Sequence, residues 1–448
     1  MQNGEQNRSW DFALAGWARA LAYALAFLAA ILTTSLHAQT LTVLHEFTGH
    51  NDGARPGGLI KDRAGNLYGS TAYGGDFSCN GGDGGVPGCG VLFEVKRDGS
   101  GWILNPLYIF PGSGQGDLSN YPGGLAIGPN GSLYGTNFLG GNGLGIYGDG
   151  SIFNATPAPA APSSVLAPWS YSVIYEFTGS SDGANPTGTA PLLFDQAGNI
   201  YGTTGYGGTS NNNGVVYKAT RSGNSWTVNG LYSFLGGSDG YSPVGVVFDD
   251  AGNLYGVTYY GGNTGCDYGD GGGCGLIYEL SPSQSGWTKT TLHVFQPGVD
   301  GGNSGALIRD ASGNLYGITT GYGPNSNGGT VWEMSPSNGG WSFAVIHAFP
   351  TQTLNGSGPF PLTMDAAGNL YGTTSLGGAD NVGFLFELTP SNGGWAYTEL
   401  YDFGTMPGRT DGCYPQGAPQ LDAAGNIYGT TQLCGSSADV GNVWKFTP

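Results

Sequence analysis

The sequence predicts an all-β fold, a seven-bladed β-propeller with four antiparallel strands in each blade. A Gly-Asn-Leu-Tyr-Gly phrase, with small variations, recurs seven times, centred on Tyr68, Tyr134, Tyr201, Tyr255, Tyr316, Tyr371 and Tyr428. The 448 residues include 87 Gly and 25 Pro, yet also 26 Tyr, 20 Phe and 10 Trp. This mixture indicates short strands joined by tight turns, since a disordered chain would be poor in large apolar groups. Repeats of 54 to 67 residues with four strands each are typical of propeller blades.

Each repeat offers four strands, which we designate A to D. Strand A is exemplified by residues 58–61, strand B by 66–71, strand C by 91–95 and strand D by 41–47. Each strand D closes with a phenylalanine; these residues are Phe47, Phe110, Phe177, Phe234, Phe295, Phe349 and Phe403.

The turn between strands A and B has its own signature. An aspartate stands four residues before the Asn in six repeats, as Asp62, Asp195, Asp249, Asp310, Asp365 and Asp422, whereas the second repeat has Gly128. The Asp-x-x-Gly-Asn pattern fits a type I turn followed by Gly in the left-handed region. Asp can cap such a turn with its side chain, so we interpret these residues as turn formers.

The order of the strands predicts how the ring closes. The first D strand, 41–47, precedes the first A strand, and the last repeat ends in its C strand, 443–446. We therefore expect the N-terminal strand to complete the last blade as its outermost strand, so that residues 39–448 form one propeller domain.

The N-terminal residues 1–38 have the pattern of a signal peptide. Arg8 and Arg19 precede an apolar run over residues 20–32, and small or polar residues follow up to a plausible cleavage site after Ala38. We expect a protein that is secreted, periplasmic or extracellular, with no membrane span once the signal is removed. Retention of this segment as an anchor is the alternative.

Six cysteines favour the same compartment. They fall into three local pairs, Cys79 with Cys89, Cys266 with Cys274, and Cys413 with Cys434, which suits disulfides in an oxidising environment. The sequence alone leaves other connectivities open. The last pair centres on the Asp422–Asn426 turn, so its members should face each other across the A–B hairpin. Zinc is disfavoured because Cys-x-x-Cys spacing is missing.

Charge narrows the classes of partner. With 31 acidic and 13 basic residues the net charge is −18, which disfavours nucleic acid. In a four-stranded blade the D–A and B–C loops emerge on one face, and these loops are the variable ones. They carry thirteen aspartates, Asp52, Asp76, Asp83, Asp117, Asp149, Asp182, Asp239, Asp267, Asp270, Asp300, Asp380, Asp411 and Asp439, opposed by Arg55 and Arg409.

Hard cations prefer oxygen ligands, so Ca²⁺ is the metal to consider on this acidic face. The densest carboxylate loops hold Asp76 with Asp83 and Asp267 with Asp270, although neither has EF-hand spacing. No other cofactor is indicated. Five of the acids form a repeated Asp-Gly before strand A and also fit turn chemistry; they are Asp52, Asp182, Asp239, Asp300 and Asp411.

Catalytic candidates are few. His45, His293 and His347 stand two residues before the strand D Phe, where other repeats have Tyr, which indicates a half-buried polar ring. No Gly-x-Ser-x-Gly elbow accompanies a histidine. The residues that break the repeat are the weak candidates, namely His50, Arg55, Asp117, Arg409 and Asp411. Arg55 and Arg409 should lie in neighbouring blades across the closure, where two guanidiniums could hold a carboxylate.

The phrases in residues 368–374, 377–378 and 386–390 (Gly-Asn-Leu-Tyr-Gly-Thr-Thr, Gly-Gly and Phe-Glu-Leu-Thr-Pro) resemble the GloVer-type tandem repeats of exported bacterial proteins. The resemblance covers nearly all of residues 41–448. It implies export and the repeat type, and little about activity. The Pro-x-x-Gly and Asp-x-x-Gly-Asn-Leu-Tyr phrases resemble NHL-type propeller blades more distantly, and this analogy implies that strand A is the innermost.

Three functions remain open. The leading hypothesis is a monomeric, non-enzymatic propeller whose acidic face binds a glycan, a cell-envelope component or a protein. The second is a carbohydrate-active hydrolase or lyase working with paired carboxylates. The third is a structural protein of a surface layer or matrix.

Overall fold

A computed structural model describes residues 39–79, 86–111, 122–140, 148–157, 169–209, 211–263, 265–266, 272–324, 328–350, 360–435 and 439–448. Nearly all of them belong to one compact unit, Leu41–Phe446. The strands are β1(Thr40–Glu46), β2(Ala54–Lys61), β3(Leu67–Tyr73), β4(Val91–Asp98), β5(Gly101–Ile109), β6(Pro122–Ile127), β7(Leu133–Asn137), β8(Ser151–Thr156), β9(Ser170–Glu176), β10(Ala184–Pro186), β11(Leu193–Phe194), β12(Ile200–Tyr206), β13(Val215–Ser222), β14(Ser225–Ser233), β15(Tyr241–Phe248), β16(Leu254–Tyr260), β17(Leu276–Ser283), β18(Gly286–Val294), β19(Gly302–Ser304), β20(Ile308–Arg309), β21(Leu315–Gly321), β22(Thr330–Ser337), β23(Gly340–Ala348), β24(Thr363–Met364), β25(Leu370–Thr374), β26(Phe384–Ser391), β27(Gly394–Asp402), β28(Cys413–Leu421), β29(Ile427–Leu433) and β30(Asn442–Thr447). Two short 3₁₀ helices, Gly237–Asp239 and Pro407–Arg409, lie in loops.

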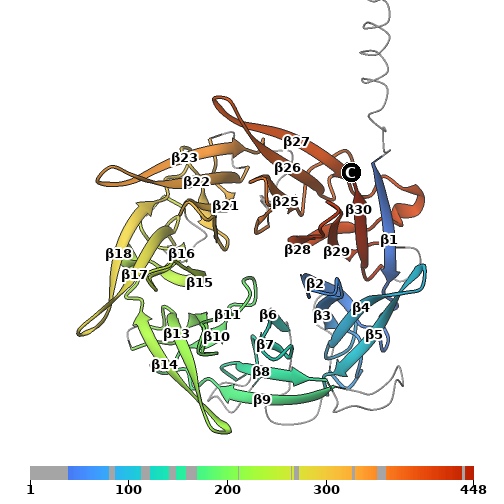
Figure 1. The fold of residues 1–448 in the computed structure, drawn as a ribbon, viewed down its shortest axis with the longest axis horizontal. Helices are drawn as coiled ribbons and strands as arrows, with labels where there is room; N and C mark the ends of the chain where they lie inside the picture. The colour runs from blue at the N-terminus through green and yellow to red at the C-terminus, as the bar shows by residue number, and fades with distance from the viewer. Residues whose placement is uncertain are drawn as a thin grey trace, which may run out of the picture. The chain divides into compact units, whose positions relative to one another are not determined.

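These strands form seven antiparallel sheets in the described part of the chain, one for each repeat. Figure 1 shows the sheets arranged as blades around a ring, with the A strands such as β2 and β28 nearest the middle and the D strands such as β5 and β27 at the outside. The predicted seven-bladed propeller is confirmed. We number the blades in chain order, so that blade 1 is β2–β5 and blade 7 contains β28–β30.

The ring closes as the strand order predicts. The sheet of blade 7 has the order β1-β30-β29-β28, so the N-terminal strand is its outermost member (Figure 1). Beyond β1, the amide of Phe47 donates to the carbonyl of Gly441 at 3.1 Å. Between blades 1 and 7, a Cβ atom on Gly417 would lie only 2.6 Å from the Cα of Gly58, so these inner strands need glycine to approach each other.

Strand A is longer and less regular than the sequence predicts. In blade 1 it begins at Ala54, and its register against β3 shifts between Pro56 and Leu59. In blades 3 and 5 the same irregularity divides strand A into two short segments, β10 with β11 and β19 with β20. Bulges of this kind bend and twist a strand, which is common at the rims of closed β structures.

The hydrophobic core lies between neighbouring blades. One cluster, for example, joins Tyr134, Ile152 and Phe177 of blade 2 to Ile200 and Tyr217 of blade 3. The phenylalanines that close the D strands are central to these clusters. Phe110, Phe177, Phe234, Phe295 and Phe403 are all less than 2% exposed. Burial of each such ring is worth roughly 1.5–3 kcal/mol.

The A–B turns form as their chemistry predicts. In blade 3, Asp195 accepts hydrogen bonds from the Asn199 amide at 2.9 Å and from its side-chain Nδ2 at 2.7 Å. The hydroxyl of Tyr201, from the repeated phrase, donates to the same carboxylate at 3.2 Å. The repeated Asp, Asn and Tyr thus make one turn module, which explains why they recur together.

Candidate functional site

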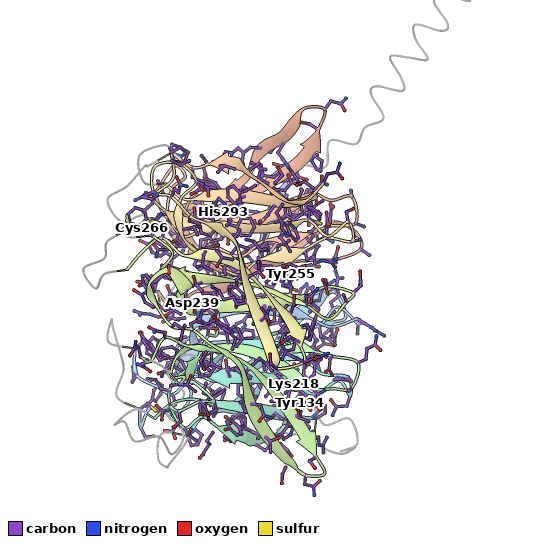
Figure 2. All side chains as sticks on the ribbon, turned by 90° about the vertical axis from the view of Figure 1, so that its left-hand side faces the viewer. Tyr134, Lys218, Asp239, Tyr255, Cys266 and His293 are labelled. Carbon is purple, nitrogen blue, oxygen red and sulfur yellow. A yellow bond between two sulfur atoms is a disulfide. The ribbon has the colours of Figure 1, made fainter. Side chains whose placement is uncertain are left out.

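The D–A and B–C loops lie on one face of the propeller, which we call the loop face. Figure 2 views the ring from its side: Cys266 and Asp239, from these loops, lie to the left, whereas Tyr134, Tyr255 and Lys218, near the A–B turns, lie further to the right. The predicted site residues that the structure describes belong to the loop face.

Five of the thirteen predicted loop acids hold the fold together. In five blades the Asp of the Asp-Gly phrase accepts a hydrogen bond from the His or Tyr ring seven to ten residues before it and another from a backbone amide of the loop. For Asp182 these donors are the Tyr175 hydroxyl at 2.8 Å and the Thr178 amide at 2.9 Å. The other ring–Asp pairs are His45–Asp52, Tyr232–Asp239, His293–Asp300 and Tyr401–Asp411.

The same rings pack against the next blade. His293 of blade 4 stacks on Phe343 of blade 5 with ring centres 3.8 Å apart, and His347 of blade 5 stacks on Tyr397 of blade 6 at 4.0 Å. Burial lowers the pKa of His347 to about 4, so this ring is neutral at pH 7. The histidines predicted to be half-buried polar rings have that environment.

A second repeated contact joins five of the blades to the blade before them. The third residue after the loop Asp has a positive φ in five blades, and these residues are Arg55, Asn185, Ser242, Asn303 and Tyr414. Each donates its backbone amide to a carbonyl of the preceding blade's B–C loop, as Asn303 does to Cys274 at 2.8 Å. The Asn303 side chain adds a bond to the Tyr259 carbonyl at 3.0 Å, and Thr320 donates to the Asn303 carbonyl at 3.1 Å.

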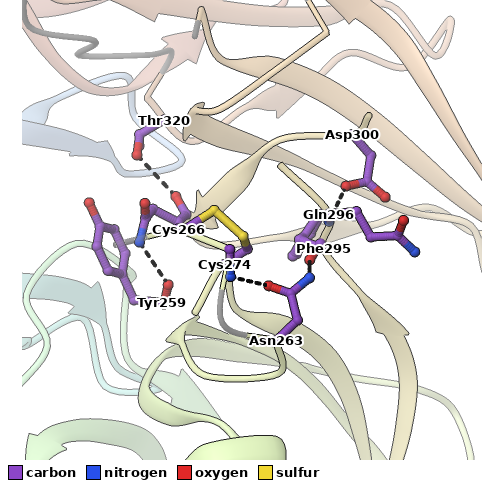
Figure 3. The surroundings of a disulfide bond; sticks show 10 residues. Tyr259, Asn263, Cys266, Cys274, Phe295, Gln296, Asp300 and Thr320 are labelled. Carbon is purple, nitrogen blue, oxygen red and sulfur yellow. Dashed lines mark hydrogen bonds between the residues drawn. A yellow bond between two sulfur atoms is a disulfide. The ribbon is translucent and has the colours of Figure 1, made fainter. Parts of the chain in front are cut away.

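All three predicted disulfides are present, and they order loop-face segments. Beside Cys266–Cys274, the Asn263 side chain donates to the Phe295 carbonyl at 2.6 Å, tying the B–C loop to the end of strand D (Figure 3). Cys413 and Cys434 are bonded where strand A begins and strand B ends, as expected, with Cα atoms 5.3 Å apart. In the β28–β29 ladder itself the backbone partner of Cys413 is Leu433, and the register shifts between Gln416 and Gln420.

Asp411, a catalytic candidate, is completely buried. Its Oδ2 accepts hydrogen bonds from the Tyr401 hydroxyl at 2.9 Å and the Thr405 amide at 3.1 Å, as its counterparts do in other blades. Its Oδ1 is enclosed without a hydrogen-bond partner among the described residues. Asp117, another candidate, lies outside the described residues.

His50 and Arg409 are exposed. The His50 ring lies against Phe77, with ring centres 5.9 Å apart, and its Nδ1 is 3.0 Å from the Thr48 carbonyl. Arg409 lies 3.8 Å from Asp380, a half-exposed ion pair. Such a pair contributes little to stability.

Arg55 and Arg409, which were predicted to lie in neighbouring blades across the closure, both contact the B–C loop of blade 7 through their backbones. The Arg55 amide donates to the Val440 carbonyl at 2.8 Å, and the Arg409 carbonyl accepts from the Gly435 amide at 3.2 Å. Both partners belong to the B–C loop of blade 7. The two guanidiniums make different contacts: Arg409 meets Asp380, and Arg55 lies over the Tyr73 ring with its central carbon 5.3 Å from the ring centre.

Of the four candidate Ca²⁺ ligands, Asp83, Asp267 and Asp270 lie outside the described residues. Asp76 accepts a hydrogen bond from the Ser78 amide at 2.9 Å. Within the described ranges, no three His, Cys, Asp or Glu side chains come together as a metal ion would require.

An acid pair on blade 6 was not anticipated from the sequence. Glu399 and Asp402 both lie on β27, and burial together with the neighbouring Asp402 carboxylate raises the pKa of Glu399 to about 7. The two residues are three apart in a strand, a spacing that gave no signal of contact.

The loop face also carries exposed apolar side chains that were not predicted from the sequence. Five large hydrophobic side chains are at least 36% exposed in the described part of the chain, and they are Phe77, Ile109, Tyr206, Leu235 and Val299. Each stands in a B–C or D–A loop or at the strand end beside one. Leu235 directly follows the strand D Phe, where two other repeats have Thr, and Val299 directly precedes the loop Asp, where others have Ser, Asn or Thr. Comparison of the repeats with one another would have revealed both.

No described helix is long and apolar enough to cross a membrane. The three disulfides are typical of an oxidising compartment and support export of the chain.

Solved structures share the fold at low sequence identity. The extracellular domain of a protein described as a hybrid two-component system from B. thetaiotaomicron has a TM-score of 0.51 and 13% identity, covering 92% of this chain and 42% of that one. An ulvan lyase, a polysaccharide lyase bound to a GlcA(1-4)Rha3S saccharide, has a TM-score of 0.51 and 12% identity, covering 86% of this chain and 90% of that one. At these identities the likeness shows the fold alone. No curated protein has a matching sequence.

The repeat itself has counterparts in other sequences. Three overlapping stretches, residues 81–269, 165–360 and 329–448, match the Gloeobacter/Verrucomicrobia repeat. Together they extend from the B–C loop of blade 1 to the C-terminus, over the turn modules, the Asp-Gly loops and the inter-blade contacts described above. The chain therefore belongs to the Gloeobacter/Verrucomicrobia repeat family.

Proposed function

We propose that the chain is an exported binding protein, acting in the periplasm or outside the cell, whose loop face recognises a glycan, a cell-envelope component or a protein. The observation that carries this proposal is the distribution of exposed apolar groups. Every large hydrophobic side chain that is at least 36% exposed in the described residues stands on the loop face. Exposed apolar groups gathered on one face of a rigid scaffold are typical of interaction sites.

The repeats supply an internal comparison for two of these residues. The hydroxyls of Thr48 and Thr178, which occupy the position of Leu235, donate to the loop Asp, so the fold favours Thr there. Leu235 is 57% exposed and gives up that bond. Val299 is 60% exposed where Ser181 and Ser238 stand in other blades. The fold gives no reason for either hydrophobic residue, and recognition of a partner gives one.

The test is binding of the purified protein to glycan arrays and to envelope fractions, compared with a variant in which Leu235→Thr and Val299→Ser restore the residues of other repeats. We expect at least a fivefold loss of affinity, since removing two exposed apolar contacts costs on the order of 1–2 kcal/mol. Arg221→Ser, at the exposed C–D hairpin on the other face, is the matched control and should bind as the parent does. Equal binding by all three proteins, or no binding to any fraction, would contradict the proposal.

A carbohydrate-active hydrolase or lyase is the alternative. It requires turnover of polysaccharides by the purified protein and loss of that turnover in Asp411→Ala and Arg55→Ala. We favour binding because Asp411 Oδ2 already accepts two hydrogen bonds within the fold. A purely structural role would appear as self-association into filaments, whereas the proposed binding protein should sediment as a monomer.

A further inference from the structure

The position of Arg55 has a defined role in other blades. Its counterparts Asn185, Ser242 and Asn303 each donate a side-chain hydrogen bond to a backbone carbonyl of the preceding blade. The acceptors are Phe138 at 2.8 Å, Gly205 at 3.1 Å and Tyr259 at 3.0 Å. In these blades the residue acts as a latch between neighbouring blades, through both its amide and its side chain.

Arg55 keeps only half of this latch. Its backbone amide donates to the Val440 carbonyl at 2.8 Å, and its φ of 54° matches the 52° to 57° of the three polar counterparts. Its side chain makes no hydrogen bond across the blade boundary. The guanidinium lies over Tyr73, and Nε is enclosed without a hydrogen-bond partner.

The fold would be served better by asparagine at this position. Asn is several-fold enriched at positive φ among residues other than glycine, whereas Arg has no such preference. An enclosed donor without a partner also costs stability, because it has lost its bond to water. A residue that is unfavourable for folding in two ways is expected where function selects it.

The acids near Arg55 are directed elsewhere. Asp52 is bound to His45 and to the Thr48 amide, and Asp439, next to Val440, accepts the Cys434 amide at 2.7 Å. No carboxylate among the described residues lies within 4.0 Å of the Arg55 guanidinium, while Arg409 has Asp380. Within the described ranges, Arg55 is thus a cation without a counter-ion in a loop region rich in acids.

We infer that Arg55 binds an anionic oxygen group of the ligand, such as the carboxylate of a uronic acid or a sulfate ester. A guanidinium matches the planar carboxylate with two parallel hydrogen bonds, and the Tyr73 ring beneath it limits its orientations. Because β2 is an inner strand, the bound group lies at the inner rim of the loop face (Figure 1). The inference rests on the proposed function and adds the class of ligand.

The corresponding residues of other blades suggest the variant that tests this role of Arg55. Arg55→Asn installs the residue of blades 3 and 5, which can donate across the blade boundary as Asn185 and Asn303 do. It should therefore fold and be at least as stable as the parent. Arg55→Lys keeps the charge without the planar fork, and Arg221→Ser removes an exposed arginine on the other face as a control.

Binding is measured by calorimetry with three probes: polygalacturonate, which carries carboxylates, dextran sulfate, and neutral dextran. We expect the parent to bind one of the two anionic probes, with a 10- to 100-fold loss in Arg55→Asn, a smaller loss in Arg55→Lys and less than a threefold change in Arg221→Ser. Preference for polygalacturonate or dextran sulfate identifies carboxylate or sulfate as the recognised group. The inference is overturned if the parent binds neither anionic probe, or if Arg55→Asn binds as the parent does.

The outcome separates this inference from the proposed function. If Leu235→Thr with Val299→Ser weakens binding to envelope fractions while Arg55→Asn changes nothing, the loop face is a binding site without an anion subsite. If the parent binds no fraction, glycan or probe, both proposals fail.

Discussion

The Lys289 ammonium lies 2.8 Å from the Asp239 carboxylate, and the Lys289 side chain is only 5% exposed. Asp239 comes from the loop that joins blades 3 and 4, and Lys289 from β18 at the outside of blade 4. The equivalent positions of blades 2, 5 and 6 hold Tyr171, Phe343 and Tyr397, which stack on the ring of the preceding blade. Blade 4 therefore replaces a stacking contact with an ion pair at the same boundary.

Removing the cation should leave Asp239 with an uncompensated charge in a partly buried site. We predict that Lys289→Ala lowers the free energy of unfolding by about 2–3 kcal/mol, toward the lower end for a broken buried ion pair because Asp239 remains bonded to Tyr232. Lys289→Tyr, the residue of blades 2 and 6, should cost about 1 kcal/mol less, since a stacked ring restores packing. Urea unfolding at pH 7 measures both. Equal losses in the two variants would show that the boundary does not accept a ring in place of the ion pair.

His347 makes stability depend on pH. Its pKa falls from about 6.5 in the unfolded chain to about 4 in the folded protein because the ring is buried against Tyr397. The unfolded state thus binds more protons between these values, so this contribution is complete above pH 6.5 and is lost as pH falls toward 4. After a discount for partial exposure, we expect a loss of roughly 1–2 kcal/mol from this residue.

The variant His347→Tyr carries the residue of four other repeats and has no group that titrates in this range. The difference between the unfolding free energies of the parent and the variant should therefore change between pH 6.5 and 4. The comparison of parent and variant is needed because Glu399 makes stability depend on pH in the opposite direction. The pKa of Glu399 is raised to about 7, so its contribution to stability is present below about pH 4.5 and is lost as pH rises to 7. Parallel curves for the two proteins would contradict the prediction.

The ring could be predicted from the sequence because seven repeats share the same features, and each feature depends on residues close together in the chain. The Asp-x-x-Gly-Asn turn, the Tyr that binds it and the strand D Phe depend on residues within one hairpin or one blade, so their pattern is visible in the sequence. Closure of the ring could also be predicted, because the strand 41–47 precedes the first A strand, and the order of strands along the chain can be read from the sequence.

The contacts between blades could not be predicted in this way. Lys289 and Asp239 are 50 residues apart, and nothing in either repeat marks the other as a partner. Arg55 and Asp411 stood out because they break the repeat, yet only the structure shows that Asp411 keeps the contacts of its counterparts while Arg55 gives one up. The bulge in β28 likewise adds a register shift that a symmetric count about the Asp422–Asn426 turn omits.

The A–B turn of blade 2 shows what the turn aspartate contributes. Gly128 replaces Asp there, and the backbone bonds from Gly128 to Ser132 at 2.9 Å and from Gly131 to Gly128 at 3.0 Å still form. We therefore predict that Asp195→Ala keeps the fold and costs only about 1–2 kcal/mol, the value of its lost side-chain hydrogen bonds.

The cost should disappear in acid. Burial alone would raise the Asp195 pKa, but hydrogen bonds from Asn199 and the charge of Lys218 outweigh burial and hold that pKa below its usual value. The stabilisation is therefore present above about pH 4 and is lost as pH falls through the lower folded value. Unfolding of parent and Asp195→Ala at pH 7 and pH 3 measures this. A gap that is as large at pH 3 would show that Asp195 acts through packing, not through its charge.

Closure of the ring by β1 allows a test by rearrangement of the chain. Deleting residues 39–47 would expose the edge of β30 and remove Phe47, which is 3% exposed and packs against Phe93 with ring centres 5.3 Å apart. Loss of Phe47 alone should cost about 3–5 kcal/mol, and an exposed edge strand favours aggregation. We predict that the deleted protein is much less stable and self-associates in size-exclusion chromatography.

Moving residues 39–47 to follow Pro448 through a short turn would restore the A–B–C–D order that blades 1 to 6 already have. In this permuted chain the same strand can pair with β30 as the fourth strand of blade 7, joined by a C–D hairpin like that between β4 and β5. We expect the urea midpoint of the permuted protein to lie close to that of the parent and far above that of the deleted protein, because a short hairpin loop closes at little entropic cost. A permuted chain as unstable as the deletion would mean that β1 contributes through its own connection to β2, and not through closure of blade 7.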